Sequence, residues 1–400
     1  MTAPTRLEKN LPIPDRGSAT ARHVLFLFDQ LRCLDGGAEG ALLKITQMLP
    51  ADRYRASVAT FWTPRDNGFL CRFPCPVHVF PLERTYGWTA WKTALKLRRL
   101  IRSEHVAIVQ TFFATSDLWG GLIAKASGCP VLVSSRRDMG FTRTPMHRAA
   151  YRLLAPLFDQ VHTVSDAVRD ATIRDDGVRP ERVVSIPNGV DLDAIPPPRD
   201  AMYARSAFGL GGASHVIADV GTVKSIKGYD TLARAAAIVC REYPKAVFVV
   251  VGRIPKDGYI DELRSLIASL GLTENFRFTG HFDNVFPVLQ MCDVFCHLSR
   301  TDGLSNALLE AMACGLPCIV SRAGGNPEVV EEGRSAFVVP SDEPEMAAQR
   351  ILTLLGSRDR ARSMGARGRR IIEQKFTAEA MVHGLVQVYD GLLAAKGLLS

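Results

Sequence analysis

The stretch SRTDGLSNALLEAMACGLP, from Ser299 to Pro317, follows an apolar run of strand length and has the pattern of a loop that opens a helix. It is one unit of a fold in which strands and helices alternate. Ser305 is the expected N-cap of this helix, because a serine hydroxyl can accept a hydrogen bond from the first turn. The free N–H groups there and the helix dipole favour the binding of a pyrophosphate.

Two acidic residues flank the start of this expected helix. Glu310 lies about five residues in, roughly 7 Å along the axis. That is the reach from a diphosphate to a ribose, whose two hydroxyls one carboxylate can accept. Asp302, in the loop, could hold hydroxyls of the group that the diphosphate carries. The alternative is an amphipathic helix with a chance acidic residue, but a partly buried carboxylate needs a partner, so we favour a binding site.

Short apolar runs alternate with helix-length amphipathic segments through most of the chain, a pattern typical of parallel sheets covered by helices. The turn at Asn188-Gly189 and the prolines at 196–198 interrupt this alternation, which then restarts. We therefore predict an α/β protein of two doubly wound, Rossmann-like domains facing each other across a cleft. The expected strands are His23–Phe28, Ala56–Phe61, Val106–Thr111, Val131–Ser134, Gln160–Val164, Val183–Ile186, Val216–Val220, Ala246–Val251, Arg277–Thr279, Val294–Leu298 and Cys318–Val320.

The expected organisation has four parts. Residues 1–20 form a polar tail, and residues 21–190 form the first Rossmann-like domain. Residues 191–375 form the second such domain. Residues 376–400 form a C-terminal helix that we expect to pack back on the first domain.

The composition is that of an ordinary globular protein, with 47% hydrophobic and 22% charged residues among 400. No apolar run approaches the roughly 18 residues that a bilayer-spanning helix requires. The first twenty residues lack the apolar core of a signal peptide. We expect a cytoplasmic protein, with its nine cysteines reduced and no metal site formed by them.

The net charge of +8 is unevenly distributed. Residues 1–188 carry 26 Lys and Arg against 17 Asp and Glu, whereas residues 189–400 carry 23 against 24. This asymmetry indicates an anionic partner for the first half, either a membrane surface, an acidic substrate or nucleic acid; drift in an arginine-rich composition is the alternative. Nucleic acid is the weakest of these candidates, because no recognition motif is present.

The segment from Asp302 to Glu310 is similar to the Glu-x7-Glu motif of glycosyltransferase family 4, and AMACGLP (Ala311–Pro317) also matches that family. Further similar segments follow the family's order between residue 23 and about residue 340. They are GGAE (Gly36–Glu39), IPNGVD (Ile186–Asp191), KG (Lys227–Gly228) and GGNPE (Gly324–Glu328).

This resemblance implies a GT-B fold, a nucleotide-diphosphate sugar donor, most commonly of UDP or GDP, and transfer with retention of anomeric configuration without a required metal or other cofactor. The chemistry implied is polysaccharide or glycoconjugate synthesis. No nucleophile is evident in the first domain, so the departing phosphate itself would help to deprotonate the acceptor hydroxyl. The protein would then mainly position groups and stabilise charge.

The resemblance also implies roles for individual residues of the donor site. Lys227 would neutralise the donor phosphates, Glu310 would hold the ribose and Asp302 the sugar. Where the family usually has an arginine this chain has Thr222, and Lys224 could restore the charge. Further candidates for donor binding are Arg253 and the main-chain N–H groups of Gly37, Gly303, Leu304 and Ser305.

The acceptor side departs from the family, many members of which carry histidines after the fourth and fifth strands. Arg136 stands about where one histidine is expected. Either the chain uses other residues to orient the acceptor, or it has lost that function. The candidates are Glu39, Phe112, Arg136, Arg137 and Asp138.

The segment from Trp88 to Arg102 combines tryptophans on one helical face with Lys and Arg on the others. Such a helix can lie on an anionic membrane, which would make the enzyme peripheral on the inner face of the plasma membrane. The alternative is a helix that covers the sheet. Three other functions also remain open: a nucleotide-sugar 2-epimerase, a phosphorylase and a non-catalytic sugar-nucleotide binding protein.

Overall fold

The computed structural model describes residues 21–33, 37–141, 143–197, 205–206 and 208–399. The predicted polar tail, residues 1–20, and Gly36 of the glycine segment lie outside the described residues. Within the described residues, none of the helices has the length and apolar character needed to cross a bilayer.

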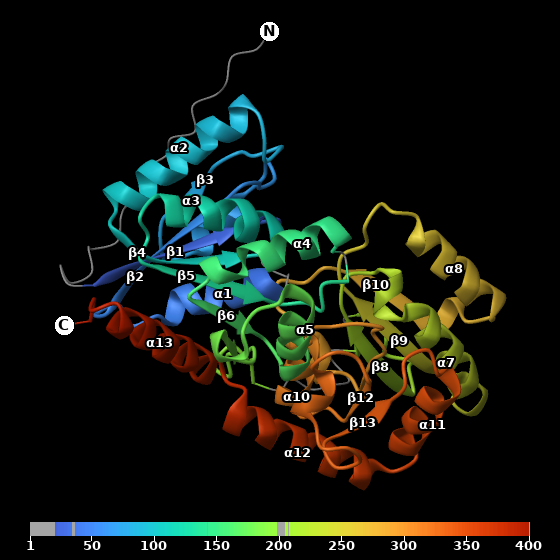
Figure 1. Cartoon of the computed structure of the whole chain (residues 1–400). Coiled ribbons are helices and arrows are strands. Elements are labelled where there is room, and N and C mark those ends of the chain that lie inside the picture. Colours follow the sequence, from blue (N-terminus) through green and yellow to red (C-terminus); the bar gives the residue numbers. More distant parts are fainter. Residues whose placement is uncertain (1–20, 34–36, 142, 198–204, 207, 400) are drawn as a thin grey trace.

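The first domain is built on a parallel sheet of seven strands in the order β3-β2-β1-β4-β5-β6-β7 (Figure 1). Its central strands are almost continuously apolar and buried, as expected for a sheet covered on both faces. The strands are β1 (Arg22–Phe28), β2 (Tyr54–Thr60), β3 (Val77–Val79), β4 (Val106–Phe112), β5 (Val131–Arg136), β6 (Gln160–Thr163) and β7 (Val183–Ser185). The covering helices are α1 (Gly37–Met48), α2 (Trp88–Ser103), α3 (Gly121–Ala126), α4 (Pro145–Leu154) and α5 (Asp166–Asp176).

The second domain repeats this architecture with six parallel strands in the order β10-β9-β8-β11-β12-β13. The strands are β8 (His215–Val220), β9 (Ala246–Val251), β10 (Phe276–Gly280), β11 (Val294–His297), β12 (Cys318–Ser321) and β13 (Ala336–Val339). The helices are α7 (Tyr229–Glu242), α8 (Tyr259–Ser269), α9 (Phe286–Gln290), α10 (Asn306–Ala313), α11 (Pro344–Leu355) and α12 (Arg358–Lys375). The predicted fold class, two doubly wound α/β domains, is confirmed.

The last helix, α13 (Ala378–Ala395), leaves the second domain and packs against the first (Figure 1). Leu385 and Tyr389 of α13 share a buried cluster with Val24 and Phe26 of β1. The Tyr389 hydroxyl also donates a hydrogen bond to Gln110 in β4. The polypeptide therefore crosses between the domains twice.

The two crossings lie side by side. The N–H of Val190 donates to the carbonyl of Phe376 (2.9 Å), and the N–H of Ala378 donates to the carbonyl of Val190 (2.8 Å). A Cβ on Gly189 would lie 2.1 Å from the carbonyl oxygen of Thr377, so the paired crossings require glycine at that position.

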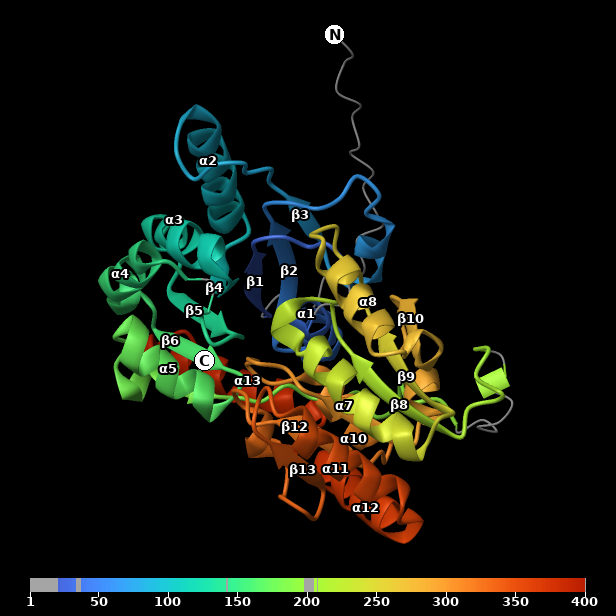
Figure 2. The same cartoon turned by 90° about the vertical axis from the view of Figure 1, so that its right-hand side faces the viewer.

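The loops at the carboxyl ends of the two sheets meet each other (Figure 2). Ser165, the N-cap of α5, donates a hydrogen bond to the carbonyl of Gly303 in the second domain (2.8 Å). The carboxylate of Glu328 accepts from the N–H groups of Asp166 (2.8 Å) and Ala167 (2.7 Å). Doubly wound folds bind their ligands at this end of the sheet.

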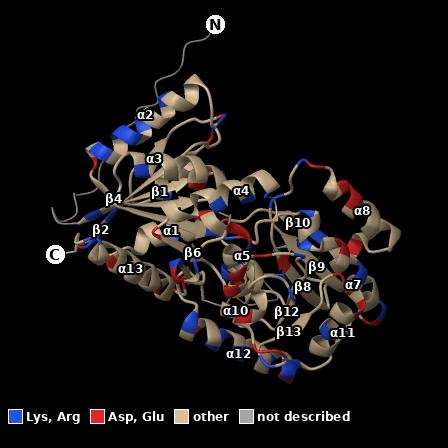
Figure 3. Cartoon of the chain, in the orientation of Figure 1, with Lys and Arg blue, Asp and Glu red and all other residues tan. Residues whose placement is uncertain are grey.

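Helix α2 covers one face of the first sheet with Leu97 and Ile101 and leaves its opposite face in solvent. Trp88 is 69% exposed and Trp91 59% exposed. Basic residues are distributed along the helix (Figure 3). The predicted sheet-covering helix is therefore confirmed, and its tryptophan face is exposed.

Candidate functional site

A chain of four charged side chains lies at the carboxyl end of the second sheet. The ammonium of Lys227 donates to Oδ1 of Asp302 (2.6 Å), whose Oδ2 lies 2.9 Å from Nε2 of His297. Nδ1 of His297 lies 2.7 Å from Oδ1 of Asp219. The structure thus brings together the two predicted residues Lys227 and Asp302, and adds two that the sequence analysis did not identify.

Local backbone geometry explains how Lys227 reaches Asp302. Lys227 ends a short 3-10 turn (Ser225–Lys227) after β8, and Gly228 follows it in the left-handed conformation at φ 70°. A Cβ on Gly228 would lie 2.1 Å from the carbonyl oxygen of Leu298. Only glycine allows this turn to pack against the end of β11, so Gly228 is a geometric requirement of the turn that carries Lys227.

The charges in this chain hold one another ionised. Burial opposes the charged form of His297, but Asp219 and Asp302 outweigh it and raise the pKa of His297 to about 9. Burial likewise opposes ionisation of Asp302, yet His297 and Lys227 keep the pKa of this carboxyl well below its usual range. Asp302 is therefore a carboxylate at neutral pH.

Glu310 lies one turn inside α10 and has a different environment. Burial raises the pKa of its carboxyl, and the charge of Lys44 on α1 of the other domain acts against that rise. No group in the described ranges donates a hydrogen bond to this carboxylate. Glu310 therefore has unused capacity to accept hydrogen bonds from a ligand.

Helix α10 has the predicted N-cap, because the hydroxyl of Ser305 accepts a hydrogen bond from the N–H of Leu308 (3.3 Å). The N–H of Ser305 itself, however, donates to Oδ1 of the buried Asn326 (3.0 Å). The prediction that this group contacts the donor phosphates is therefore corrected, since its hydrogen is already used. The N–H groups of Gly303 and Leu304 have no acceptor within the described part of the chain, and both residues are buried.

A second set of contacts joins the glycine segment of the first domain to α10. Asn306 donates through Nδ2 to the carbonyl of Gly37 (3.1 Å) and accepts from Asn188 (2.7 Å). Arg137 in turn donates to Asn188. Asn188 and Asn306 belong to motifs quoted above, but their side chains carried no predicted role.

Lys224 and Arg253 lie apart from the buried chain of charges. Both side chains are exposed, on the loops that follow β8 and β9. These loops are joined where the N–H of Val223 donates to the carbonyl of Arg253 (2.9 Å). The two cations can therefore reach the site only from its solvent side.

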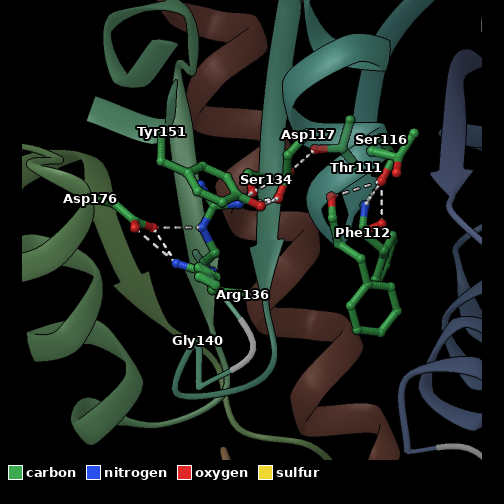
Figure 4. Close-up of polar contacts among 12 residues, drawn as sticks. Thr111, Phe112, Ser116, Asp117, Ser134, Arg136, Gly140, Tyr151 and Asp176 are labelled. Atoms are coloured by element: carbon green, nitrogen blue, oxygen red, sulfur yellow. Dashed lines mark hydrogen bonds and ion pairs between the residues drawn. The ribbon is translucent and has the colours of Figure 1, made fainter. Parts of the chain in front are cut away.

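The structure corrects the acceptor-side assignment of Arg136 (Figure 4). Its guanidinium is 2% exposed, forms ion pairs with Asp117 and with Asp176 (3.2 Å), and lies 4.1 Å from the ring centre of Tyr151. Asp117 also accepts from Thr111, Ser134 and Tyr151. This buried network uses the charge of Arg136 fully, so the side chain is not available to an acceptor.

The remaining acceptor-side candidates have three different environments. Phe112 is completely buried and its ring packs 5.2 Å from that of Phe28, so its assignment to the acceptor site is also corrected. Asp138 accepts from the N–H of Gly140 (2.6 Å) and stabilises a turn.

Arg137 and Glu39 lie near the contacts of Gly37, and Nη1 of Arg137 is buried without a partner within the described residues. Burial lowers the pKa of Arg137 to about 10, with Glu39 opposing.

Within the described ranges, no three His, Cys, Asp or Glu side chains are grouped so that they could hold a metal ion.

Comparisons with known proteins agree with this architecture. The family model for glycosyl transferases group 1 matches residues 204–371, and the model for glycosyltransferase family 4 matches residues 35–194. The GDP-mannose-dependent alpha-(1-6)-phosphatidylinositol monomannoside mannosyltransferase of Mycobacterium tuberculosis (strain H37Rv) is 30% identical over 317 residues, which are 76% of this chain and 80% of the relative. The D-inositol 3-phosphate glycosyltransferase of Saccharomonospora viridis is 28% identical over 307 residues, 74% of this chain and 70% of the relative.

Solved structures show the same fold. Anabaena HepE in complex with UDP and glucose has a TM-score of 0.81 at 23% identity, over 92% of this chain and 99% of that chain. WaaG, a glycosyltransferase involved in lipopolysaccharide biosynthesis, has a TM-score of 0.73 at 16% identity, over 92% and 100%. With two Rossmann-like domains, the motifs in order and these relatives, the chain belongs to glycosyltransferase family 4 and has the GT-B fold.

Proposed function

We propose that this enzyme transfers a sugar from a nucleotide-diphosphate donor to a hydroxyl of a glycan or lipid-linked acceptor, with retention of configuration and without a divalent metal. One observation carries the proposal. Glu310 is a largely buried carboxylate to which no described residue donates a hydrogen bond, one turn inside the helix whose entrance is flanked by Lys227 and Asp302. A ribose with two adjacent hydroxyls would satisfy it.

The relatives support the class of donor and of acceptor. The mycobacterial relatives are described as GDP-mannose-dependent and act on a phosphatidylinositol mannoside. HepE was solved with UDP and with UDP-glucose. A UDP or GDP sugar is therefore the donor class to test first.

The residues on the page can carry out such a transfer by positioning and by charge. The ammonium of Lys227, which pairs with Asp302 in this structure, would also contact the donor phosphates. There it would offset the negative charge that grows as the diphosphate leaves. Asp302 would accept from hydroxyls of the transferred sugar. The departing phosphate would take the proton of the acceptor hydroxyl on the same face, which gives retention without a protein nucleophile.

The direct test is Glu310→Ala. Losing a charged acceptor for two hydroxyls is expected to weaken binding of UDP or GDP by about 10- to 100-fold, measured by calorimetry, while the thermal midpoint changes little. Glu242→Ala, which removes an exposed carboxylate at the far end of α7, is the matched control. Unchanged nucleotide affinity in Glu310→Ala would contradict the ribose role.

The enzyme should remain active in EDTA, and its product should have the same anomeric configuration as the donor. A strict requirement for Mg²⁺ or Mn²⁺ would contradict the metal-free mechanism.

We also propose that the enzyme works in the cytoplasm, peripherally bound to the anionic inner face of the plasma membrane through α2. The support is the exposed tryptophan face of this helix and the exposed cations beside it. The cytoplasmic leaflet attracts such basic segments. A lipid-linked acceptor would then be presented to the same domain.

A further inference from the structure

Two ionisable side chains are buried in the middle of the second sheet, where apolar residues are the rule. Asp219 is the fifth residue of β8 and His297 the last of the neighbouring β11. Asp219 is 1% exposed and His297 is fully buried. Burying a charged pair is generally no more stabilising than an apolar pair of the same size, so a role other than stability is the better explanation for this one.

The geometry connects this pair directly to the donor site. His297 contacts Asp219 through one ring nitrogen and Asp302 through the other, at 2.7 and 2.9 Å. We propose that Asp219 and His297 are positioning residues that fix the carboxylate of Asp302 for the donor sugar and, through it, the ammonium of Lys227. This inference rests on the proposed function, in which Asp302 and Lys227 bind the donor.

The length of the Asp302 side chain agrees with such a role. Related motifs have glutamate here, which is one methylene longer. With aspartate, one carboxylate oxygen meets His297 and the other meets Lys227, so both torsions of the side chain are restrained. Each oxygen keeps a second lone pair for a sugar hydroxyl. A glutamate would displace the carboxylate from His297, so the shorter acid fits the distance to this histidine.

The same contacts require His297 to be a cation. A neutral imidazole has one N–H, but here each ring nitrogen faces a carboxylate, so both must donate. The charged groups around His297 are Asp219 from β8, Asp302 from the following loop and Lys227 from the turn before α7. The other titratable neighbours, Tyr229 and Cys296, are neutral, because burial raises both pKa values well above their ordinary values.

The test combines two variants with the kinetic constants for the donor between pH 6 and 8. His297→Gln can donate to only one carboxylate, so the donor KM should rise by about 10- to 100-fold and stay independent of pH. Asp219→Asn keeps its volume but removes the carboxylate that most favours the imidazolium. In that variant the donor KM should be near normal at pH 6 and rise toward pH 8, whereas the wild-type KM stays flat.

His23→Gln is the matched control, because His23 is also buried but lies at the start of β1, bonded to Ser57 (2.7 Å). It should lower stability and leave the donor KM and its pH profile unchanged. Normal donor KM with a flat profile in both folded site variants overturns the proposal. So does a wild-type protein in which ¹⁵N NMR shows His297 neutral at pH 8, a measurement that does not depend on any variant folding.

Failure of this inference is distinguishable from failure of the proposed function. If the wild type binds neither UDP nor GDP nor their sugars, the donor site itself is wrong. If Glu310→Ala weakens nucleotide binding while His297→Gln and Asp219→Asn behave as the wild type, only the positioning role fails.

Discussion

Arg136 shows how a charged residue near an active site can be purely structural. Its guanidinium lies between the carboxylates of Asp117 and Asp176, and Arg143 pairs with Asp176 from the other side at 2.8 Å. These groups come from the end of β5, the loop before α4, the end of α5 and the turn before α3. The network therefore ties the end of the fifth strand to the helices that cover it.

Arg136→Met should destabilise the protein strongly, because it leaves two buried carboxylates without their shared cation. Removing one partner of such a buried group costs about 3–5 kcal/mol, measured by urea unfolding. Below the unfolding temperature, the kinetic constants for donor and acceptor should be near those of the wild type.

Two further variants sharpen this prediction. Adding Asp117→Asn to Arg136→Met removes one uncompensated charge and should recover part of the lost stability. Arg174→Met, which breaks an exposed ion pair with Asp175, should leave the urea midpoint unchanged. An Arg136→Met protein of normal stability with a raised acceptor KM would instead restore the acceptor role.

The sequence was sufficient to bring Lys227 and Asp302 together at one end of the second sheet, since both follow strands whose carboxyl ends meet. The sequence was insufficient to place the side chain of Arg136, because the strand pattern does not show toward which face of the sheet the last residue of a buried strand points. The partners Asp117 and Asp176 are 19 and 40 residues away in the chain. Asp219 and His297 were missed, although each is a polar residue inside an apolar strand, a signal that could have found them.

Helix α2 carries an exposed apolar face, and this face contains the tryptophans that the sequence analysis had singled out. Trp88, Trp91 and Leu95 are all at least 49% exposed, and Lys92 lies 5.6 Å from the ring centre of Trp88. The opposite face is buried on the sheet. A helix anchored on one face and amphiphilic on the other can place its tryptophans at the lipid headgroups while the lysines remain near anionic phosphates.

The enzyme should therefore bind vesicles of phosphatidylglycerol and phosphatidylcholine in flotation experiments, and binding should weaken as salt rises. Replacing Lys92 and Lys96 by Gln should cost about 2 kcal/mol of binding, roughly 30-fold. Trp88→Ser with Trp91→Ser should abolish it.

Trp62→Ser is the control for this experiment, because Trp62 is 46% exposed in the same domain but lies outside α2. It should bind vesicles as the wild type does. If Trp62→Ser lost vesicle binding as fully as the α2 variants, or if the wild type bound no vesicles at low salt, the membrane proposal would be wrong.

Among the elements, all strands inside the two sheets were predictable from the sequence, and two edge strands were not. Eleven strands were expected and found, but β3 (Val77–Val79) and β13 (Ala336–Val339) were missed. Both missed strands lie at the edge of their sheet, where each pairs with a single neighbouring strand that offers its hydrogen-bonding edge. Between β4 and β5 the chain forms a π-helical turn (Ser116–Gly120) followed by α3.

The arrangement of the two domains depends on a small contact that the GGNPE segment provides. Gly325 lies against Ser165 so closely that a Cβ would be 2.3 Å from the Cβ of Ser165. Three residues later, Glu328 accepts the first two N–H groups of α5 from the opposite domain. A carboxylate at a helix N-terminus also interacts favourably with the helix dipole. The motif thus joins the domains at one edge of the proposed donor site.

Gly325→Ala should force this edge apart, and Glu328→Ala should loosen it. Because Glu328 is solvent-exposed, we expect its loss to weaken the contact by about 0.5–1 kcal/mol, which shifts the ratio of closed to open molecules roughly two- to fivefold. Small-angle scattering should show a larger radius of gyration for both variants, most clearly for Gly325→Ala, and the donor KM should rise.

Glu331→Ala is the control, because it removes the same charge three residues away, from a pair with Arg367 inside the second domain. Its scattering should equal that of the wild type. Scattering curves that are identical for all four proteins would mean that other contacts, chiefly the paired crossings and α13, hold the domains together.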